Sequence, residues 1–333
     1  MHNRSDRPLR FGILGCADIG WRRTLPAMAE EPSVRIVAVA SRDADKAGAF
    51  AERFGAEAVT GYGELLARDD IDAVYVPLPT GLHAEWVGRA LESGRHVLAE
   101  KPLSTGGTRT TELLATAAER ELLLWENLTF VHHTQHRTIR DLVAGGALGV
   151  IRSLAAVFGI PPLPAGDIRY RPELGGGALL DLGPYVAQTA LLYLGPDLEV
   201  VGASRRIDEA TGVDVSGAAL LRAPSGATAA LTFGFEHAYA SMYTLWGETG
   251  RLELDRAYTP PPDREPVVRI VRQAGTEVLK LPAENQFRNS VRSFAAAIAA
   301  GEPRPMDAVN IARRAGLLDR IREVSAAEVA PVG

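Results

Sequence analysis

The chain has 333 residues, of which 46% are hydrophobic and 23% are charged, and its formal net charge is −5. This length allows two domains, each with its own core. The acidic balance gives no basic field that would attract nucleic acid or an anionic membrane, so we expect neither as a partner. No apolar run approaches the ~20 residues of a membrane helix, the first residues lack the apolar core of a signal peptide, and the single cysteine excludes an internal disulfide. These features predict a cytoplasmic globular protein.

Strand-like and helix-like segments alternate in the first part of the chain. Apolar runs predict strands at 10–16, 34–40, 71–79, 96–102 and 122–127. The segments between them have helical periodicity, and several end in glycine. Continuous valine-rich runs are typical of parallel strands that are buried on both faces. We therefore predict an α/β fold that begins with a Rossmann-type domain, a doubly wound parallel sheet, over residues 1–127.

A glycine-rich loop follows the first predicted strand and reads GILGCADIG. In a dinucleotide-binding turn, small residues let the backbone approach a pyrophosphate, and the next helix supplies N–H groups at its N-terminus. Ala17 stands where the middle glycine of the fingerprint would be, so the match is imperfect. The residues expected at the cofactor are Gly12, Gly15, Cys16, Ala17, Asp18 and Ile19.

The second predicted strand ends in Ser41-Arg42, where an NAD enzyme usually places an acid for the ribose 2′-hydroxyl. A hydroxyl followed by a guanidinium suits a 2′-phosphate instead, and Lys46 adds charge one helical turn later. Asp43 is better explained as a residue at the N-terminus of the following helix. We therefore predict NADP(H) rather than NAD(H) as the cofactor, with the alternative that Arg42 merely faces solvent.

The pattern changes after residue 127. Helices are predicted at 134–149, 285–301 and 310–325. Strands are predicted at 150–160, 199–207, 215–223, 227–236, 241–247 and 250–256. Their alternation indicates an open, mainly antiparallel sheet with one face toward solvent or another subunit. We assign residues 128–333 to this C-terminal α/β domain.

Two segments carry the residues that suggest catalysis. Three of the thirty-six cationic side chains are lysines, and one of them ends an apolar strand in the tripeptide Glu100-Lys101-Pro102. Lysine, unlike arginine, can lower a neighbour's pKa or relay a proton. Asp181 and Tyr185 are four residues apart and would share one face of a helix. A nearby ammonium would lower the pKa of a tyrosine from its usual value near ~10, which makes Lys101 and Tyr185 a candidate donor pair.

Each candidate also has a structural interpretation. Lys101 alone would fit a surface lysine, and Tyr185 would fit a packed aromatic of a helix. Arg169, shortly before the glycine triplet, would either meet a substrate diphosphate or lie on the surface. The histidines within 132–136 lack a neighbouring acid or thiol ligand, so we predict no metal site there and expect them to line a cleft or cap a helix.

The segments GILGCADIG, VASRD, EKP and GGGALLDLGPY together resemble the glucose–fructose oxidoreductase/inositol dehydrogenase (Gfo/Idh/MocA) family, over essentially the whole chain. The resemblance implies an NADP(H)-binding domain and a substrate-binding domain whose sheet packs against another subunit in a homo-oligomer, a dimer or tetramer. It places the family's lysine at Lys101, its acidic residue at Asp181, and Tyr185 where many members have histidine. It further implies cofactor contacts from Leu78, Pro79, Thr80, His83, Glu100 and Lys101.

Longer segments, among them FGIPPLPAGDIRYRPELGGGALLDLG and YTLWGETGRLELDRAYTPP, look like those of the C-3 ketoreductases of deoxysugar pathways. This likeness implies that NADPH reduces the 3-keto group of a dTDP-linked 3,4-diketo-2,6-dideoxyhexose during antibiotic biosynthesis. Lys101, Arg169, Asp181 and Tyr185 would then bind the sugar substrate. Tyr185 is favoured as the proton donor, with Lys101 as the alternative.

Two other functions share these residues. An NADP-dependent sugar or dihydrodiol dehydrogenase acting on free sugars would use the same lysine and tyrosine. The family also contains a non-catalytic nucleotide-sensing regulator. Because a sensor has no need of a proton donor, the presence of both Lys101 and Tyr185 favours an enzyme.

Overall fold

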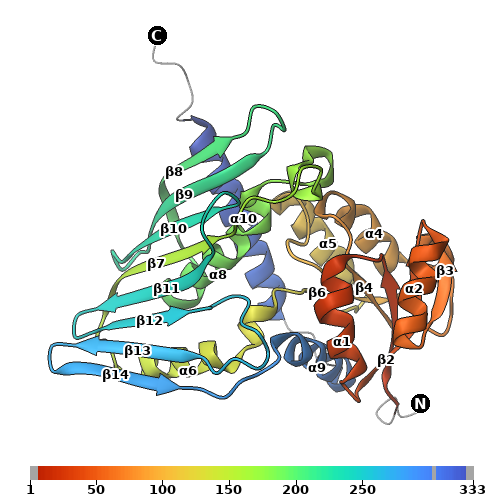
Figure 1. Cartoon of the computed structure of the whole chain (residues 1–333), viewed down its shortest axis with the longest axis horizontal. Helices are drawn as coiled ribbons and strands as arrows, with labels where there is room; N and C mark the ends of the chain where they lie inside the picture. The colour runs from red at the N-terminus through yellow and green to blue at the C-terminus, as the bar shows by residue number, and fades with distance from the viewer. Residues whose placement is uncertain (1–6, 302–304, 328–333) are drawn as a thin grey trace. The chain divides into compact units, whose positions relative to one another are not determined.

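The computed structural model describes residues 7–301 and 305–327 (Figure 1). The chain forms two units, one made of Met1–Thr129 and Gln286–Ala312 and the other of Phe130–Asn285 and Arg313–Gly333. Each unit is built on its own sheet, with six strands in the first and eight in the second among the described residues. The C-terminal helices contribute to both units, so the chain passes between them more than once.

The sheet of the first unit consists of parallel strands in the order β3-β2-β1-β4-β5-β6. Its strands are β1 (Leu9–Leu14), β2 (Val34–Ser41), β3 (Glu57–Thr60), β4 (Ala73–Val76), β5 (His96–Ala99) and β6 (Leu124–Glu126). The predicted doubly wound parallel sheet is confirmed. Because the strand order reverses between β1 and β4, ligands are expected beyond the carboxyl ends of the strands at this point.

Apolar cores cover both faces of this sheet. Along β4, Val74 and Val76 belong to one core cluster and Ala73 and Tyr75 to the other, as the alternation of a strand requires. The helical elements of the unit are η2 (Gly20–Thr24), α1 (Leu25–Ala29), α2 (Ala44–Phe54), α3 (Tyr62–Leu66), α4 (Thr80–Glu92), α5 (Gly107–Glu119) and α9 (Gln286–Ala300).

Helix α9 corrects the sequence-based division of the chain. Residues 285–301 were assigned with the second domain, yet Val291 and Phe294 are fully buried in a core of the first unit. The Phe294 ring lies 5.8 Å from Phe11 and 5.7 Å from Trp125, measured between centroids. An amphipathic helix shows in its sequence that it has an apolar face, but not which sheet that face will cover.

The second unit has a mixed, mostly antiparallel sheet in the order β14-β13-β12-β11-β7-β10-β9-β8. Strands β7 and β10 pair in parallel and the other neighbours antiparallel, which confirms the mainly antiparallel sheet. Its strands are β7 (Ile151–Gly159), β8 (Glu199–Ile207), β9 (Asp214–Arg222), β10 (Thr228–Gly234), β11 (Ala240–Gly247), β12 (Arg251–Asp255), β13 (Val267–Arg272) and β14 (Gly275–Lys280).

Helix α8 (Gly183–Leu194) packs on one face of this sheet, where it contacts β7 and β10. We call this covered face the inner face and the opposite one the outer face. Other helical elements of the chain are η3 (Thr129–His132), α6 (Thr134–Ala144), η4 (Ile168–Tyr170), η5 (Pro172–Leu174), α7 (Ala178–Asp181) and α10 (Pro305–Ala327). Among the helices that the structure describes, none combines the length and apolar character that a bilayer crossing requires.

Asp72 ties the start of β1 to the loop before β4. Its carboxylate accepts the Arg10 backbone N–H at 3.0 Å and the guanidinium groups of Arg10 and Arg7 at 2.8 to 3.1 Å. Burial would raise the pKa of Asp72, but these hydrogen bonds outweigh it and hold the pKa well below its usual range. Such a group contributes stability above the pKa of the unfolded chain and loses that contribution as the pH falls toward the folded value.

We expect Asp72→Asn to lower the free energy of unfolding by about 1–3 kcal/mol at pH 7, because an amide cannot replace the ionic hydrogen bonds of both arginines. The deficit should shrink below about pH 4, where the carboxylate of the unfolded parent chain takes up a proton. Urea unfolding at pH 7 and pH 3 measures both values, with the exposed Asp69→Asn as control. An equal deficit at the two pH values would contradict the ionic explanation.

Candidate active site

The turn after β1 has the backbone that a dinucleotide phosphate requires. Gly15 has φ +122°, and a Cβ there would lie 2.7 Å from Leu78 Cδ2, so glycine is needed. A helical segment begins at residue 18, and Ala17 O accepts the Trp21 N–H at 3.0 Å. The first N–H groups of a helix have no partner within it, so they suit an incoming anion.

Packing and burial explain two neighbouring residues, Gly12 in β1 and Cys16 in the turn that follows. A Cβ at Gly12 would lie 2.7 Å from Leu65 Cδ2 and from Ile71 Cδ1, so Gly12 makes room for the core. Cys16 Sγ lies 3.6 Å from Lys46 O, and burial raises the pKa of the thiol to about 11. A thiol with this pKa is protonated at neutral pH, so Cys16 is not suited to act as a nucleophile.

The end of β2 leaves a guanidinium at the surface. Arg42 is exposed, whereas the Asp43 carboxylate caps α2 by accepting the N–H groups of Asp45 and Lys46 at 3.1 and 3.2 Å. Ser41 Oγ accepts the Asp43 N–H at 3.1 Å. The prediction that Asp43 serves the helix terminus is confirmed. The Asp43 carboxylate is engaged at the helix terminus, which leaves the exposed Arg42 guanidinium next to the buried Ser41 hydroxyl.

Tyr62 is a candidate cofactor-binding residue that the sequence did not indicate. It follows Gly61, whose N–H donates to Ser41 O at 2.8 Å, and its ring lies 4.9 Å from that of Trp86. Burial raises the pKa of the Tyr62 hydroxyl, and the Arg42 guanidinium opposes that rise because it lies close by. The signal was missed because β3, which leads to Tyr62, is short and mostly exposed.

His83 was predicted to contact the cofactor, but its side chain is fully buried. Nδ1 lies 2.8 Å from Pro102 O and Nε2 lies 2.7 Å from Leu78 O. Burial lowers the pKa of the imidazole, while the two carbonyls act in the opposite direction. His83 therefore joins the loops after β4 and β5, and its contribution to a cofactor site passes through these loops. Pro79 and Thr80, by contrast, are half-buried where α4 begins.

Glu100 is a buried carboxylate directly before Lys101. Tyr75 donates its hydroxyl to Glu100 Oε1 at 2.7 Å, and Asn127 Nδ2 donates to the same oxygen at 2.8 Å. Ser290 Oγ in turn donates to Asn127 Oδ1 at 2.8 Å. Burial raises the pKa of Glu100, and these donors oppose the rise. The network fixes the backbone that carries the half-buried Lys101 at the end of β5.

Asp181 and Tyr185 lie on either side of a junction between two helices in the second unit. The sequence predicted one continuous helix, which is wrong, because α7 ends at Asp181 and α8 begins at Gly183. Pro184 occupies the first turn of α8, where proline is tolerated. Asp181 therefore ends α7 and Tyr185 belongs to α8, so these two residues, four positions apart, do not lie on one continuous helix.

Arg169 forms an ion pair with Asp181. Its Nε lies 2.8 Å from Asp181 Oδ2, and its Nη1 lies 3.1 Å from Asp167 Oδ1. The two carboxylates raise the pKa of the guanidinium, and Asp181 has the larger effect. Because one cation faces two anions here, Arg169 is better suited to orient Asp181 than to attract the diphosphate that the sequence suggested.

The ring of Tyr185 is fixed by aromatic neighbours. Its centroid lies 4.9 Å from that of Phe158, 5.6 Å from Tyr258 and 5.8 Å from Phe130. Thr189 Oγ1 donates to Tyr185 O at 2.9 Å one turn later. The packing that the structural interpretation predicted is therefore present. It also fixes the ring direction, which a proton donor requires. Lys101 belongs to the first unit and Tyr185 to the second, and their cooperation stays a prediction.

Two of the histidines near residue 133 serve local structure. His133 Nδ1 accepts the Gln135 N–H at 3.2 Å and so caps α6, one of the two roles predicted. His136 is buried, with Nδ1 3.0 Å from the Tyr243 hydroxyl and Nε2 2.9 Å from Ala257 O. Within residues 7–301 and 305–327, no three His, Cys, Asp or Glu side chains gather as a metal ion would require.

Comparison with known families identifies the class of protein. Residues 9–128 match the model of the oxidoreductase family with an NAD-binding Rossmann fold, and residues 136–253 match the GFO/IDH/MocA C-terminal domain. These two matches cover most of the chain. The chain therefore belongs to the Gfo/Idh/MocA oxidoreductase family.

Within this family the chain is similar to reductases of one sugar nucleotide. It is 54% identical over 316 residues to the dTDP-3,4-didehydro-2,6-dideoxy-α-D-glucose 3-reductase of Actinomadura kijaniata, covering 95% of both chains. The enzyme of the same name from Saccharopolyspora spinosa is 54% identical over 295 residues, 89% of both. That from Streptomyces antibioticus is 51% identical over 318 residues, 95% of this chain and 97% of the relative.

Solved structures show the same likeness. The A. kijaniata 3-ketoreductase in complex with NADP and TDP-benzene superposes with a TM-score of 0.93 at 53% identity, covering 95% of this chain and 98% of that one. Other structures of that enzyme carry a tyrosine-to-phenylalanine, a lysine-to-alanine or a lysine-to-glutamate substitution. An aldose–aldose oxidoreductase from Caulobacter crescentus, 23% identical over 97% of this chain and 98% of its own, has a TM-score of 0.87 and shares the fold.

We expect Tyr75→Phe to lower the free energy of unfolding by about 1–3 kcal/mol at pH 7, because the buried Glu100 carboxylate loses a donor. The deficit should be smaller at pH 4, because a protonated Glu100 carboxyl requires fewer hydrogen-bond donors than a carboxylate. In the folded chain the pKa of Glu100 is raised, so its protonation occurs at a higher pH than that of a free glutamate side chain. Chemical denaturation at both pH values tests this, and a deficit that grows on acidification would refute it.

Proposed function

We propose that this protein is an NADPH-dependent sugar 3-ketoreductase that reduces the C-3 keto group of a dTDP-3,4-diketo-2,6-dideoxyhexose. The observation that carries the proposal is identity above 50%, over nearly the full length, to reductases of this one substrate. The residues expected for such chemistry, Lys101, Asp181 and Tyr185, are all present. As a deoxysugar enzyme it would act in the cytoplasm during antibiotic biosynthesis.

The first unit fits NADP(H). Gly15 allows close approach of a phosphate, and the helical segment that begins at residue 18 offers N–H groups. The exposed Arg42 would bind the 2′-phosphate, supported by Ser41 and the neighbouring Tyr62, while Asp43 is engaged as a helix cap. Bound NADPH supplies the hydride of the reaction.

Besides binding the cofactor, the protein must stabilise negative charge on the carbonyl oxygen of the substrate. Negative charge develops there as the carbon is reduced, and donors placed at that oxygen lower the barrier. We assign the proton to the Tyr185 hydroxyl, with Lys101 stabilising the phenolate and orienting the sugar; Lys101 as the donor is the alternative. Asp181, held by Arg169, orients the sugar or Lys101.

Oligomerisation through the second sheet is part of the proposal. Its outer face exposes Trp246 by 60% and Met242 by 39% on β11, and Leu220 by 44% on β9. Large apolar side chains on a sheet face mark an interaction surface. A second copy of the chain is the partner we propose, in a dimer or tetramer. Sedimentation velocity at micromolar concentration tests this, and a monomer would contradict it.

The first experiment measures NADPH oxidation at about 340 nm with freshly generated dTDP-3,4-diketo-2,6-dideoxyhexose, in parallel with free sugars and NADP⁺. We expect rapid oxidation with the nucleotide-linked substrate alone. Reduction of NADP⁺ by free sugars, with no response to the diketo substrate, would replace the proposal with a sugar dehydrogenase.

Tyr185→Phe should lower kcat by about 10²-fold or more while NADPH affinity stays within about twofold, because a general acid acts in the transition state. Tyr193→Phe is the matched control, since Tyr193 lies two turns later in α8 with its hydroxyl 2.7 Å from that of Tyr243. Turnover that survives Tyr185→Phe but is lost in Lys101→Ala would transfer the donor role to Lys101.

Arg42→Ala should weaken NADPH binding by about tenfold or more and leave NADH binding within about twofold, because the lost charge meets the 2′-phosphate. Fluorescence titration with each cofactor gives both constants. Arg35→Ala is the control, an exposed arginine near the opposite end of β2. Equal weakening of the two cofactors would exclude the 2′-phosphate role.

A further inference from the structure

A buried carboxylate holds the start of the helix that ends in Asp181. Asp214 is the first residue of β9 and is 7% exposed. Its Oδ2 accepts the backbone N–H of Leu179, the second residue of α7, at 2.6 Å. The Asp181 N–H donates to Gly177 O at 3.1 Å in the same turn. The carboxylate therefore fixes the peptide groups that carry Asp181.

The last glycine of the triplet before α7 is explained by this contact. Gly177, its last member, has φ +111°, and a Cβ there would lie 2.5 Å from Asp214 Oδ1. Any residue with a Cβ at this position would have to displace the carboxylate that reaches Leu179, so only glycine fits. Gly177 therefore allows the Asp214 carboxylate to approach α7, in addition to any approach of a substrate.

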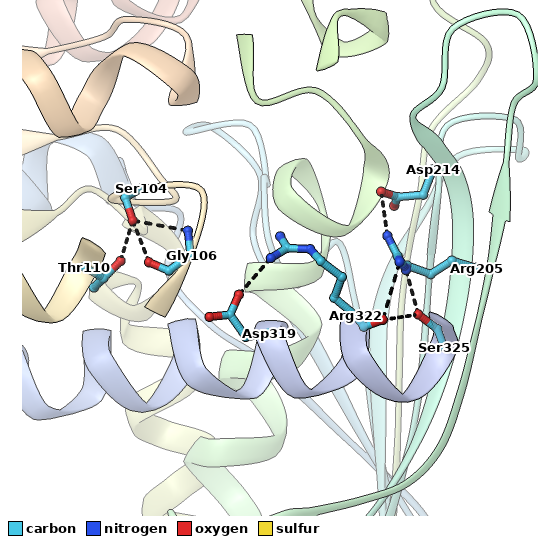
Figure 2. A network of polar contacts seen from close by, with 8 residues as sticks. All are labelled: Ser104, Gly106, Thr110, Arg205, Asp214, Asp319, Arg322 and Ser325. Atoms are coloured by element: carbon cyan, nitrogen blue, oxygen red, sulfur yellow. Dashed lines mark hydrogen bonds and ion pairs between the residues drawn. The ribbon is translucent and has the colours of Figure 1, made fainter. Parts of the chain in front are cut away.

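Arg205 holds the carboxylate from the neighbouring strand. Its Nη1 lies 3.4 Å from Asp214 Oδ1, its Nε donates to Ser325 Oγ at 2.7 Å, and its Nη2 donates to Arg322 O at 3.5 Å. Figure 2 shows this chain of contacts running from Asp214 through Arg205 to the last turns of α10, where Arg322 also meets Asp319 at 2.8 Å. Strands β8 and β9 and helix α10 thus converge on the start of α7.

The arrangement is electrostatically costly. Burial raises the pKa of the Asp214 carboxyl, while the Leu179 N–H and the Arg205 charge oppose that rise. Replacing a buried ion pair with apolar groups is often neutral or stabilising, so stability alone does not call for one here. The Asp214 carboxylate instead fixes the position of one peptide N–H, that of Leu179, which lies two residues before Asp181.

We propose that Asp214 is a positioning residue for the catalytic face of the second unit: by holding Leu179 N–H it sets Asp181 and the α7–α8 junction that precedes Tyr185. Arg205 and Ser325 keep Asp214 in place. This inference rests on the roles proposed above for Asp181 and Tyr185, and it adds residues that the reaction itself does not touch.

The test uses Asp214→Asn in the full chain. Asparagine keeps the volume and an acceptor for Leu179 but loses the charge that Arg205 holds. We expect kcat to fall by about tenfold or more with NADPH affinity within about twofold, since small misplacements of reacting groups are expensive. Glu199→Gln is the matched control: Glu199 also pairs with an arginine, Arg222, across β8 and β9, but both side chains are more than half exposed.

A milder variant guards against failure to fold. Ser325→Ala removes the 2.7 Å support of Arg205 without touching α7. We expect it to lower kcat by about two- to fivefold, in the same direction as Asp214→Asn. Full kcat in both variants would overturn the proposal.

A double-mutant cycle separates positioning from general destabilisation. If Asp214 acts through Asp181, Asp214→Asn should cost little further kcat in an Asp181→Asn background. Equal losses in both backgrounds would overturn the positioning role. Hydrogen exchange over 177–182 supplies a readout without turnover: faster exchange in Asp214→Asn, unchanged in Glu199→Gln, supports the proposal. If Asp181→Asn and Tyr185→Phe were both fully active, the catalytic assignment would fail. Unchanged exchange in Asp214→Asn would separately refute the role of the Asp214 charge in holding the Leu179 N–H.

Discussion

The structure depends on one constraint: buried carboxylates next to the candidate catalytic residues must be hydrogen-bonded. Glu100 in the first unit and Asp214 in the second are both taken out of water, and burial raises the pKa of each. A buried acid is tolerated when donors face it, and such donors must be held at hydrogen-bond distance. Each carboxylate is therefore tied to its donors at hydrogen-bond distance. Glu100 itself directly precedes Lys101, and Leu179, the donor to Asp214, lies in the helix that ends in Asp181.

The two units apply this constraint in different ways. In the first, the donors to Glu100 are side chains, Tyr75 and Asn127, so the carboxylate and the strand end are fixed together. In the second, the donor to Asp214 is a backbone N–H, so the helix start itself is fixed. His83 links two loops in a similar way, because its buried ring nitrogens lie within hydrogen-bond distance of the carbonyl oxygens of Leu78 and Pro102. Fixed peptide groups are what preorganised catalysis requires, since reorganisation during reaction raises the barrier.

Periodicity in the sequence was enough to predict the two sheets and the strand ends that bear Arg42 and Lys101. It failed where elements are short or exposed: β3 and β14 are mostly exposed, and α3 and β3 have only five and four residues from which to read a period. It also failed for α9, whose apolar face is evident but whose partner, the core around Phe11, lies far away in the sequence. A period reports a buried face and carries no information about the surface that buries it.

The same limit applies to the candidate site. Motifs pointed to Lys101, Asp181 and Tyr185 because reacting residues follow local turns and glycine patterns. Their supports are distant in sequence: Ser290 reaches Asn127 across 163 positions, and Asp214 reaches Leu179 across 35. Arg169 shows the consequence, since its charge alone suggested a phosphate, whereas Asp167 and Asp181 already face that charge in the fold. A residue's formal charge in a sequence therefore becomes a functional argument only when the charges that surround it in the fold are known.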